Sequence, residues 1–126
     1  NKEDLKSKIS KASYIVTQEH GTEAPFSGEL LDTKEEGIFT CVCCGNELFS
    51  SDTKYDSGTG WPSFWDVLNE NSVGEEIDKS HGMIRTEVHC QKCNAHLGHL
   101  FPDGPMPTGK RYCMNSVAMQ FKKSDK

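Results

Sequence analysis

The sequence predicts a mainly β fold, in which antiparallel strands form one domain behind a short N-terminal helix. Three observations support this prediction. Short runs of β-branched and aromatic residues recur between clusters of Gly and Pro. The clearest helical spacing of apolar residues is confined to the first twelve positions. A chain of 126 residues suits one hydrophobic core better than two, so a single domain is expected over residues 1–126.

The N-terminal elements are predicted from the spacing of their apolar residues. A helix is expected over residues 2–12, because Leu5, Ile9 and Ala12 recur at helical spacing among charged residues. Residues 14–17 form a β-prone run and predict a short strand. The next stretch, residues 20–28, contains Gly and Pro and is expected to be a loop.

The middle of the chain predicts a hairpin and a glycine-rich loop. Residues 37–41 are expected to form a strand, and residues 47–49 its return strand. The turn between them contains Gly45, which allows backbone N–H groups to point towards cysteine sulfur. Residues 56–64 form a loop rich in Gly that carries Trp61.

The last third of the chain predicts further strands. Strands are expected between residues 73 and 90, and then over residues 110–114 and 116–121. In the last of these, alternate positions are apolar, which is the period of a strand. Residues 102–109 contain three prolines and predict a loop, and the polar tail 122–126 is expected to fray.

Composition excludes some classes of protein. With 14 Lys and Arg against 19 Asp and Glu, the formal net charge is −5, which argues against a dedicated nucleic-acid binder. No apolar run approaches the roughly 18 residues that a membrane-spanning helix needs. No secretory apolar segment opens the chain. We therefore expect no nucleic-acid partner, no membrane partner and a cytoplasmic location.

Four of the six cysteines form two C-x-x-C pairs, Cys41 with Cys44 and Cys90 with Cys93. Two such pairs are typical of a tetrahedral zinc site with four thiolate ligands. Four protein ligands leave no position for water, so this zinc would be structural and would staple distant segments together. The alternatives are two disulfides or a thioredoxin-like redox pair, which would need a βαβ pattern that the sequence lacks. The fifth, Cys43, is expected to be a small packed side chain.

The sixth cysteine, Cys113, lies alone in sequence. A lone cysteine in a strand is more often buried and inert than reactive. Here Arg111 and Asn115 would share its side of the strand, where a positive charge favours the thiolate and an amide offers hydrogen bonds.

Two histidines and a tryptophan are further candidates for a site. His96 and His99 could exchange protons near neutral pH, since four thiolates already satisfy the zinc, although they could equally be ordinary surface residues or metal ligands. Trp61 lies between Gly60 and Pro62, in a loop shaped to present an indole to a small apolar group such as a methyl. Its alternative role is core packing.

Several of these stretches together resemble a known family, methionine sulfoxide reductase B. The two C-x-x-C pairs and the segment Gly21–Glu23 followed by Pro25 and Phe26 fit its zinc-containing form. The resemblance spans about residues 14–121, which we take as the core of the domain. The stretches that carry it are GTGWPSF at 58–64, HLGHLF at 96–101, DGP at 103–105 and PTGKRYCMNS at 107–116.

The resemblance implies a fold of two antiparallel sheets and reduction of the R epimer of methionine sulfoxide, within proteins or free. It implies that Cys113 is the nucleophile and becomes a sulfenic acid, that Trp61 holds the substrate methyl, and that zinc is bound by Cys41, Cys44, Cys90 and Cys93. It also implies acid–base or polar roles for His96 and His99, and roles in tuning and orientation for Arg111 and Asn115.

The chain departs from the family at Thr59, where many members carry a resolving cysteine. We therefore expect thioredoxin or another external thiol to reduce the sulfenic acid directly, with Cys43 as the alternative internal thiol. A monomer is expected. The rival interpretation of the whole sequence is a zinc-ribbon interaction module in which Cys113 is merely structural.

Overall fold

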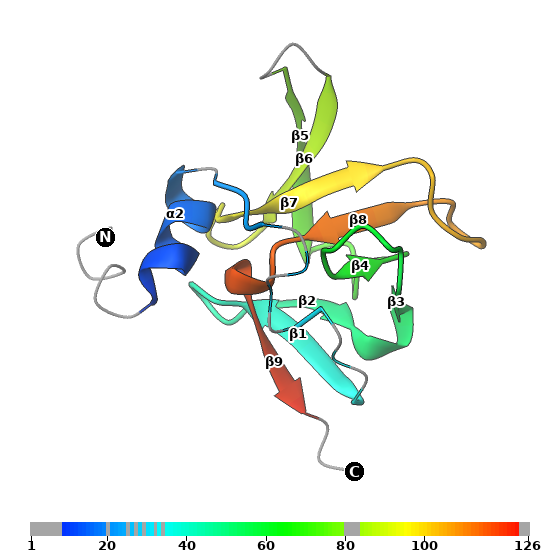
Figure 1. The fold of residues 1–126 in the computed structure, drawn as a ribbon, viewed down its shortest axis with the longest axis horizontal. Helices are drawn as coiled ribbons and strands as arrows, with labels where there is room; N and C mark the ends of the chain where they lie inside the picture. The colour runs from blue at the N-terminus through cyan, green and yellow to red at the C-terminus, as the bar shows by residue number, and fades with distance from the viewer. Residues whose placement is uncertain are drawn as a thin grey trace.

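The computed structural model describes residues 9–19, 21–24, 26, 28, 30–31, 33, 35–79 and 84–123. Within these ranges, one α-helix precedes a series of short strands (Figure 1). The helix is α2 (Lys11–Glu19), and two short 3-10 turns are η1 (Ser51–Thr53) and η3 (Ser116–Ala118). The strands are β1 (Gly37–Cys41), β2 (Glu47–Ser50), β3 (Lys54–Tyr55), β4 (Ser63–Phe64), β5 (Val73–Asp78), β6 (Arg85–Cys90), β7 (His96–Phe101), β8 (Arg111–Met114) and β9 (Met119–Lys123).

The strands form two antiparallel sheets. The smaller sheet has the order β2-β1-β9, and the larger has the order β3-β4-β8-β7-β6-β5. The long β5–β6 hairpin extends away from the small sheet (Figure 1). The predicted fold class, mainly β with two antiparallel sheets and one N-terminal helix, is confirmed. No helix in the described ranges is both long enough and apolar enough to cross a membrane.

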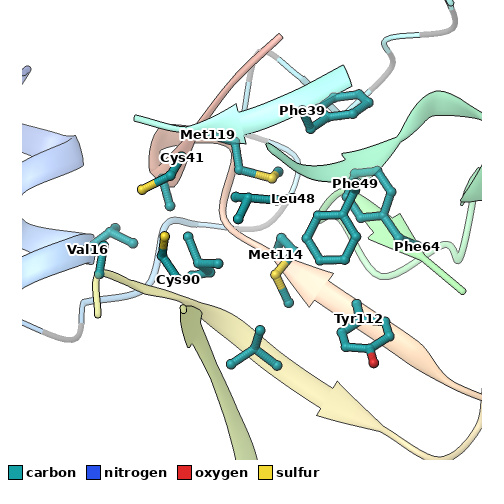
Figure 2. Packing of buried hydrophobic residues seen from close by; sticks show 14 residues of the cluster. Val16, Phe39, Cys41, Leu48, Phe49, Phe64, Cys90, Tyr112, Met114 and Met119 are labelled. Atoms are coloured by element: carbon teal, nitrogen blue, oxygen red, sulfur yellow. The ribbon is translucent and has the colours of Figure 1, made fainter. Parts of the chain in front are cut away.

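Aromatic side chains from both sheets form the centre of the core (Figure 2). Phe49 of β2 stacks on Phe64 of β4 with ring centroids 4.3 Å apart, and Phe39 of β1 meets Phe64 edge to face at 5.0 Å. Tyr112 of β8 lies 5.5 Å from Phe49. These contacts bury aromatic area from both sheets at once, so the core fixes one sheet against the other.

The side chains of β8 alternate between the two faces of the large sheet, one of which packs on the core and the other of which we call the site face. Tyr112 and Met114 are buried and point into the cluster (Figure 2). Successive side chains of a strand point to opposite faces, so Arg111 and Cys113 lie on the other face. The burial pattern of β8, which alternates from half-buried to buried, agrees with this division.

The helix lies further along the chain than its predicted position. Residues 2–8 are outside the described ranges, and residues 14–17, predicted as a strand, lie inside α2. The Ser10 hydroxyl accepts a hydrogen bond from the Ser13 backbone N–H at 3.1 Å, which caps the helix start. Val16 and Thr17 are buried in the core, so tertiary packing outweighs the β propensity of this run.

The last strand also differs from its predicted bounds. Residues 116–118 form η3, and β9 begins only at Met119 and continues to Lys123. The Val117 N–H is taken by the Glu23 carboxylate at 3.1 Å, and the Ala118 N–H by the Asn115 carbonyl, also at 3.1 Å. These N–H groups are therefore not free for a strand ladder. Lys122 and Lys123, predicted to fray, pair with β1, and residues 124–126 lie outside the described ranges.

Candidate functional site

The two C-x-x-C pairs form matching turns at the ends of β1 and β6. After the first pair, the Gly45 N–H donates to the Cys41 carbonyl at 2.9 Å. After the second, the Asn94 N–H donates to the Cys90 carbonyl at 2.8 Å. Gly45 and Asn94 both adopt positive φ, at 80° and 64°, which glycine and asparagine tolerate best. Each turn therefore directs two sulfur atoms to the same side.

The four cysteine sulfurs converge on one point. All four Sγ atoms lie within 4.8 Å of one another, and the cross-pair distances are 3.6 Å from Cys41 to Cys93 and 3.5 Å from Cys44 to Cys90. A tetrahedral zinc site with Zn–S bonds of about 2.3 Å has sulfur–sulfur edges of about 3.8 Å. The donor set and its spacing therefore fit a zinc ion bound by four thiolates.

This centre joins the two sheets. Cys41 ends β1 of the small sheet, and Cys90 ends β6 of the large sheet. Figure 2 shows both sulfurs at the end of the core nearest Val16 of α2. Asn46 adds a second link, since its Nδ2 donates to the Ser72 carbonyl at 3.1 Å and lies 3.7 Å from the Cys90 sulfur.

Cys43 lies beside this centre but outside the four-sulfur cluster. Its sulfur contacts Oγ1 of Thr17 at 3.4 Å and Nε2 of Gln18 at 3.6 Å, both on α2. The cysteine is half-buried and packs against the core cluster. It is therefore a packing contact between the first turn and the helix.

The site face of the large sheet contains a cavity of about 280 Å3. Cys113 lines this cavity together with five other residues that were singled out in the sequence. These lining residues are Thr59, Trp61, His99, Arg111 and Asn115. The structure therefore brings side chains of the glycine-rich loop, of β7 and of the segment 111–115 together around one cavity.

Cys113 sits in the middle of this cavity wall because of the strand register. On β8 it lies between Ser63 of β4 and His99 of β7. Burial raises the pKa of the Cys113 thiol, while the Thr59 hydroxyl and the positive charge of Arg111 oppose the rise. The charge predicted to favour the thiolate is present, but burial has the larger effect in the free protein.

Arg111 is held in place by two partners. Its guanidinium makes a bidentate pair with Asp103, at 2.8 Å from Nε and 3.2 Å from the second nitrogen. Its Cζ also lies 4.3 Å from the ring centroid of Phe101, the residue opposite it on β7. The charge is therefore fixed on the cavity side of β8.

The two histidines occupy different positions. His99 lines the cavity, and its Nε2 lies 2.9 Å from an Asp78 carboxylate oxygen that also pairs with Arg85 at 3.3 Å. His96 is buried behind it, with ring centroids 5.6 Å apart, and its Nδ1 lies 3.2 Å from the Glu87 carboxylate. Only His99 is positioned to meet a molecule in the cavity.

Asn115 holds the cavity wall together. Its Nδ2 donates to the Leu97 carbonyl at 2.9 Å, and its Oδ1 accepts the Glu23 backbone N–H at 2.9 Å. The Glu23 carbonyl in turn accepts Nε1–H of Trp61 at 2.9 Å. A single buried amide therefore ties β7 to the segment that fixes the indole.

Sequence reasoning missed three supporting acids: Glu23, Asp78 and Asp103. Their partners are distant in sequence, at separations of 92 for Glu23 with Asn115 and 21 for Asp78 with His99. Glu23 and Asp103 both lie in stretches that carry the family resemblance, but no rule of sequence spacing pairs Glu23 with Asn115 or Asp103 with Arg111. Asp78 carries no local signal, because only the β5–β6–β7 register brings it to His99.

Comparisons with known proteins identify relatives of this chain. The family model described as SelR domain matches residues 9–123. A peptide methionine sulfoxide reductase MsrB from Hahella chejuensis is 54% identical over 123 residues, which cover 98% of this chain and 88% of the relative. The protein of the same name from Escherichia coli O45:K1 is 55% identical over 119 residues, which cover 94% and 87%.

A solved structure shares the fold alone. The Mis18 Yippee-like domain aligns with a TM-score of 0.58 and 20% identity. The alignment covers 73% of this chain and 100% of that domain. The sequence relatives go further than the fold, since more than half of their residues are identical over nearly the whole chain. The chain belongs to the methionine sulfoxide reductase B family, whose members carry the SelR domain.

Proposed function

We propose that this protein reduces the R epimer of methionine sulfoxide to methionine, with Cys113 as the nucleophile. The observation that carries the proposal is the position of the Cys113 sulfur in a cavity between an indole, an imidazole and a guanidinium. The relatives are named as peptide methionine sulfoxide reductases, which supports oxidised methionine in proteins as the substrate, with the free amino acid as a second possibility for the test.

The reaction transfers the sulfoxide oxygen to cysteine. The Cys113 thiolate attacks the sulfoxide sulfur, and a proton from His99, directly or through water, reaches the sulfoxide oxygen. The protonated oxygen then moves to the Cys113 sulfur: a Cys113 sulfur–oxygen bond forms, while the sulfur–oxygen bond of the substrate and the transient sulfur–sulfur bond both break. Methionine leaves with two more electrons, and Cys113, which has lost these two electrons, keeps the oxygen as a sulfenic acid, S–OH.

The other cavity residues bind and orient. Trp61 offers an apolar wall to the methyl group, which would distinguish the two epimers by where the oxygen must then point. Arg111 provides a fixed positive charge that stabilises the Cys113 thiolate. Asn115 positions Trp61 through the Glu23 backbone, and the buried His96 packs against the ring of His99.

An external thiol completes the cycle. It attacks the sulfenic acid, releases water and leaves a mixed disulfide, which a second thiol cleaves to restore Cys113. Thr59 lines the cavity where a resolving cysteine would be needed, so we propose thioredoxin or a similar dithiol as the reductant. Cys43 is committed to contacts with α2 beside the zinc centre, which argues against its participation.

We propose zinc as the ion bound by Cys41, Cys44, Cys90 and Cys93. Zinc would occupy a closed site there and hold the two sheets together. None of these four cysteines lines the cavity around Cys113, so the chemistry at Cys113 does not use the zinc. A cytoplasmic location and a monomeric state stay predictions.

The test is turnover of the two sulfoxide epimers separately, with thioredoxin and with dithiothreitol. We expect activity on the R epimer alone, with both reductants, and none for Cys113→Ser. Equal activity on the S epimer would contradict the assigned specificity. A zinc-ribbon interaction module would reduce neither epimer, and its Cys113 would show no protection by substrate.

A further inference from the structure

A row of hydroxyl groups connects Cys113 to the glycine-rich loop. Thr59 Oγ1 lies 3.9 Å from the Cys113 sulfur, and Ser57 Oγ lies 2.8 Å from Thr59 Oγ1. Ser63 Oγ lies 2.6 Å from Ser57 Oγ and donates to the Trp61 carbonyl at 3.1 Å. The row therefore begins at the candidate nucleophile and ends at a backbone acceptor.

The end of the row fixes the direction of its protons. Each hydroxyl has one proton to donate, and the Trp61 carbonyl can only accept. Ser63 uses its proton on that carbonyl, so Ser57 must donate to Ser63. Thr59 then donates to Ser57, and its oxygen faces the Cys113 thiol as an acceptor.

Ionisation of Cys113 changes which acceptor is best for the Thr59 proton. A thiolate has no proton and accepts strongly, and hydrogen bonds to a charged group are roughly twice as strong as neutral ones. The Thr59 hydroxyl can rotate from Ser57 to the sulfur, while Ser57 keeps the Thr59 backbone N–H at 3.4 Å. The sulfur and Ser57 thus compete for one proton.

We propose that Thr59 is a positioning residue for Cys113, whose hydroxyl proton stabilises the thiolate, and that Ser57 opposes it by competing for that proton. The lowering effect of the Thr59 hydroxyl on the pKa of Cys113 agrees with this geometry. The position occupied by a resolving cysteine in many relatives would thus serve a different purpose here. The importance of the Thr59 hydroxyl for catalysis rests on the proposed function. The competition between Ser57 and the Cys113 sulfur for the Thr59 proton does not depend on it.

Several other groups face Cys113 and must stay constant in any test. Arg111 lies on its own strand, and His99 and Arg85 line the cavity from β7 and β6. Glu23 and Tyr55 also interact with it electrostatically, from the N-terminal segment and from β3. Substitution of Ser57 or Thr59 alters none of these charges, so a change in ionisation would report the hydroxyls.

The test is the pH dependence of Cys113 alkylation by iodoacetamide in the zinc-loaded protein. Trypsin releases residues 112–122, a peptide in which Cys113 is the only cysteine, so mass spectrometry reads this thiol alone. Thr59→Val should raise the alkylation midpoint by about half to one pH unit, because it removes the proton that stabilises the thiolate. Thr59→Ser should stay near the wild-type midpoint. Ser57→Ala should lower the midpoint by about half a unit, because the Thr59 proton loses its competing acceptor.

A matched control disturbs the same loop without touching the hydroxyl row. The Asp56 carboxylate accepts the Gly58 N–H at 2.9 Å, so Asp56→Ala loosens the turn and should leave the midpoint unchanged. An unchanged midpoint in Thr59→Val, or shifts of the same sign in Thr59→Val and Ser57→Ala, would overturn the proposal. If Ser57→Ala fails to fold, the comparison of Thr59→Val with Thr59→Ser still decides the role of the hydroxyl. Alkylation needs no sulfoxide, so failure of the proposed reduction would leave this test intact.

Discussion

At the scale of single residues, most side chains of the candidate site are held by hydrogen bonds to other parts of the protein. The Cys113 sulfur itself lies 3.9 Å from the Thr59 hydroxyl and also interacts with the Arg111 guanidinium. Around it, Arg111, Asn115 and Trp61 each have a named acceptor that sets their orientation. A site built in this way needs little reorganisation when a substrate enters.

The contact between His99 and Asp78 gives a prediction at this scale. In Asp78→Asn, the carboxylate that lies 2.9 Å from the His99 ring and orients it is lost. We expect kcat for sulfoxide reduction to fall about tenfold, with KM nearly unchanged, since general acid catalysis contributes about 10²-fold or more.

The control for this variant is Glu76→Gln on the same strand. Glu76 is exposed and lies 3.9 Å from His89, so its loss should leave kcat within about twofold of wild type, as expected for a surface ion pair. Equal losses in both variants would show that charge on β5 matters rather than the orientation of His99.

The sequence identified several residues of the candidate site but not the residues that hold them in place. Cys113, His99, Arg111 and Trp61 belong to short motifs whose residue types already indicate chemistry. Their partners Asp78 and Glu23 belong to ordinary polar stretches and reach the site only through strand register and loop closure. Their pairing depends on tertiary contacts, which no local spacing encodes.

At the scale of elements, most strands and the presence of an N-terminal helix were predictable, but the position of the helix was not. Runs such as residues 37–41 combine β propensity with a bounding turn, and both signals agree. In residues 14–17, β-branched side chains favour a strand, but the Ser10 cap and burial of Val16 and Thr17 favour a helix. The helix forms because tertiary burial outweighs local propensity there.

Gly45, in the turn between β1 and β2, and Gly98, in β7, allow a second prediction. Gly45 has φ of 80° and open space around a would-be Cβ, so Gly45→Ala should cost about 1–2 kcal/mol of unfolding free energy from backbone strain alone. A Cβ at Gly98 would lie 2.1 Å from the Cys113 carbonyl oxygen and force β7 away from β8. Gly98→Ala should therefore cost about 3 kcal/mol or more and also distort the cavity.

Urea unfolding of the zinc-loaded proteins measures both costs, and iodoacetamide alkylation of Cys113 shows whether the cavity changes. Gly58→Ala provides a further comparison, with φ of 74° and no atom near its would-be Cβ. A Gly98→Ala protein as stable as Gly45→Ala would contradict the close approach of β7 to β8.

At the scale of the whole molecule, the four-cysteine cluster and the aromatic core connect the same two sheets. The core contacts run from Phe39 and Phe49 to Phe64 and Tyr112, while the four cysteines bring the end of β1 to the end of β6. The long separation of the two cysteine pairs was visible in the sequence and predicted a staple. Which sheets it joins was not, because that depends on how the strands are ordered.

Metal removal tests this arrangement. Binding of zinc to four thiolates contributes roughly 10 kcal/mol or more in small zinc domains, which is comparable to the total stability of a domain. We therefore expect Cys44→Ser, or treatment with a strong chelator, to release one zinc ion per chain and to abolish cooperative thermal unfolding.

Cys43→Ser is the matched control, since it changes the neighbouring thiol but none of the four ligands. It should retain one zinc ion per chain and unfold cooperatively. Loss of zinc from Cys43→Ser with retention in Cys44→Ser would mean that the ligand set is wrong.

The most direct test of the central claim follows a single turnover without reductant. The zinc-loaded protein is mixed with one equivalent of the R sulfoxide, and sulfenic acid is trapped with dimedone, which avoids confusion with oxidation of Met114 or Met119 in the same peptide. We expect one methionine to form per chain, together with a dimedone adduct on Cys113 in the peptide of residues 112–122, and neither product from the S epimer. Methionine formed without an adduct on Cys113, or formed equally by Cys113→Ser, would contradict the claim.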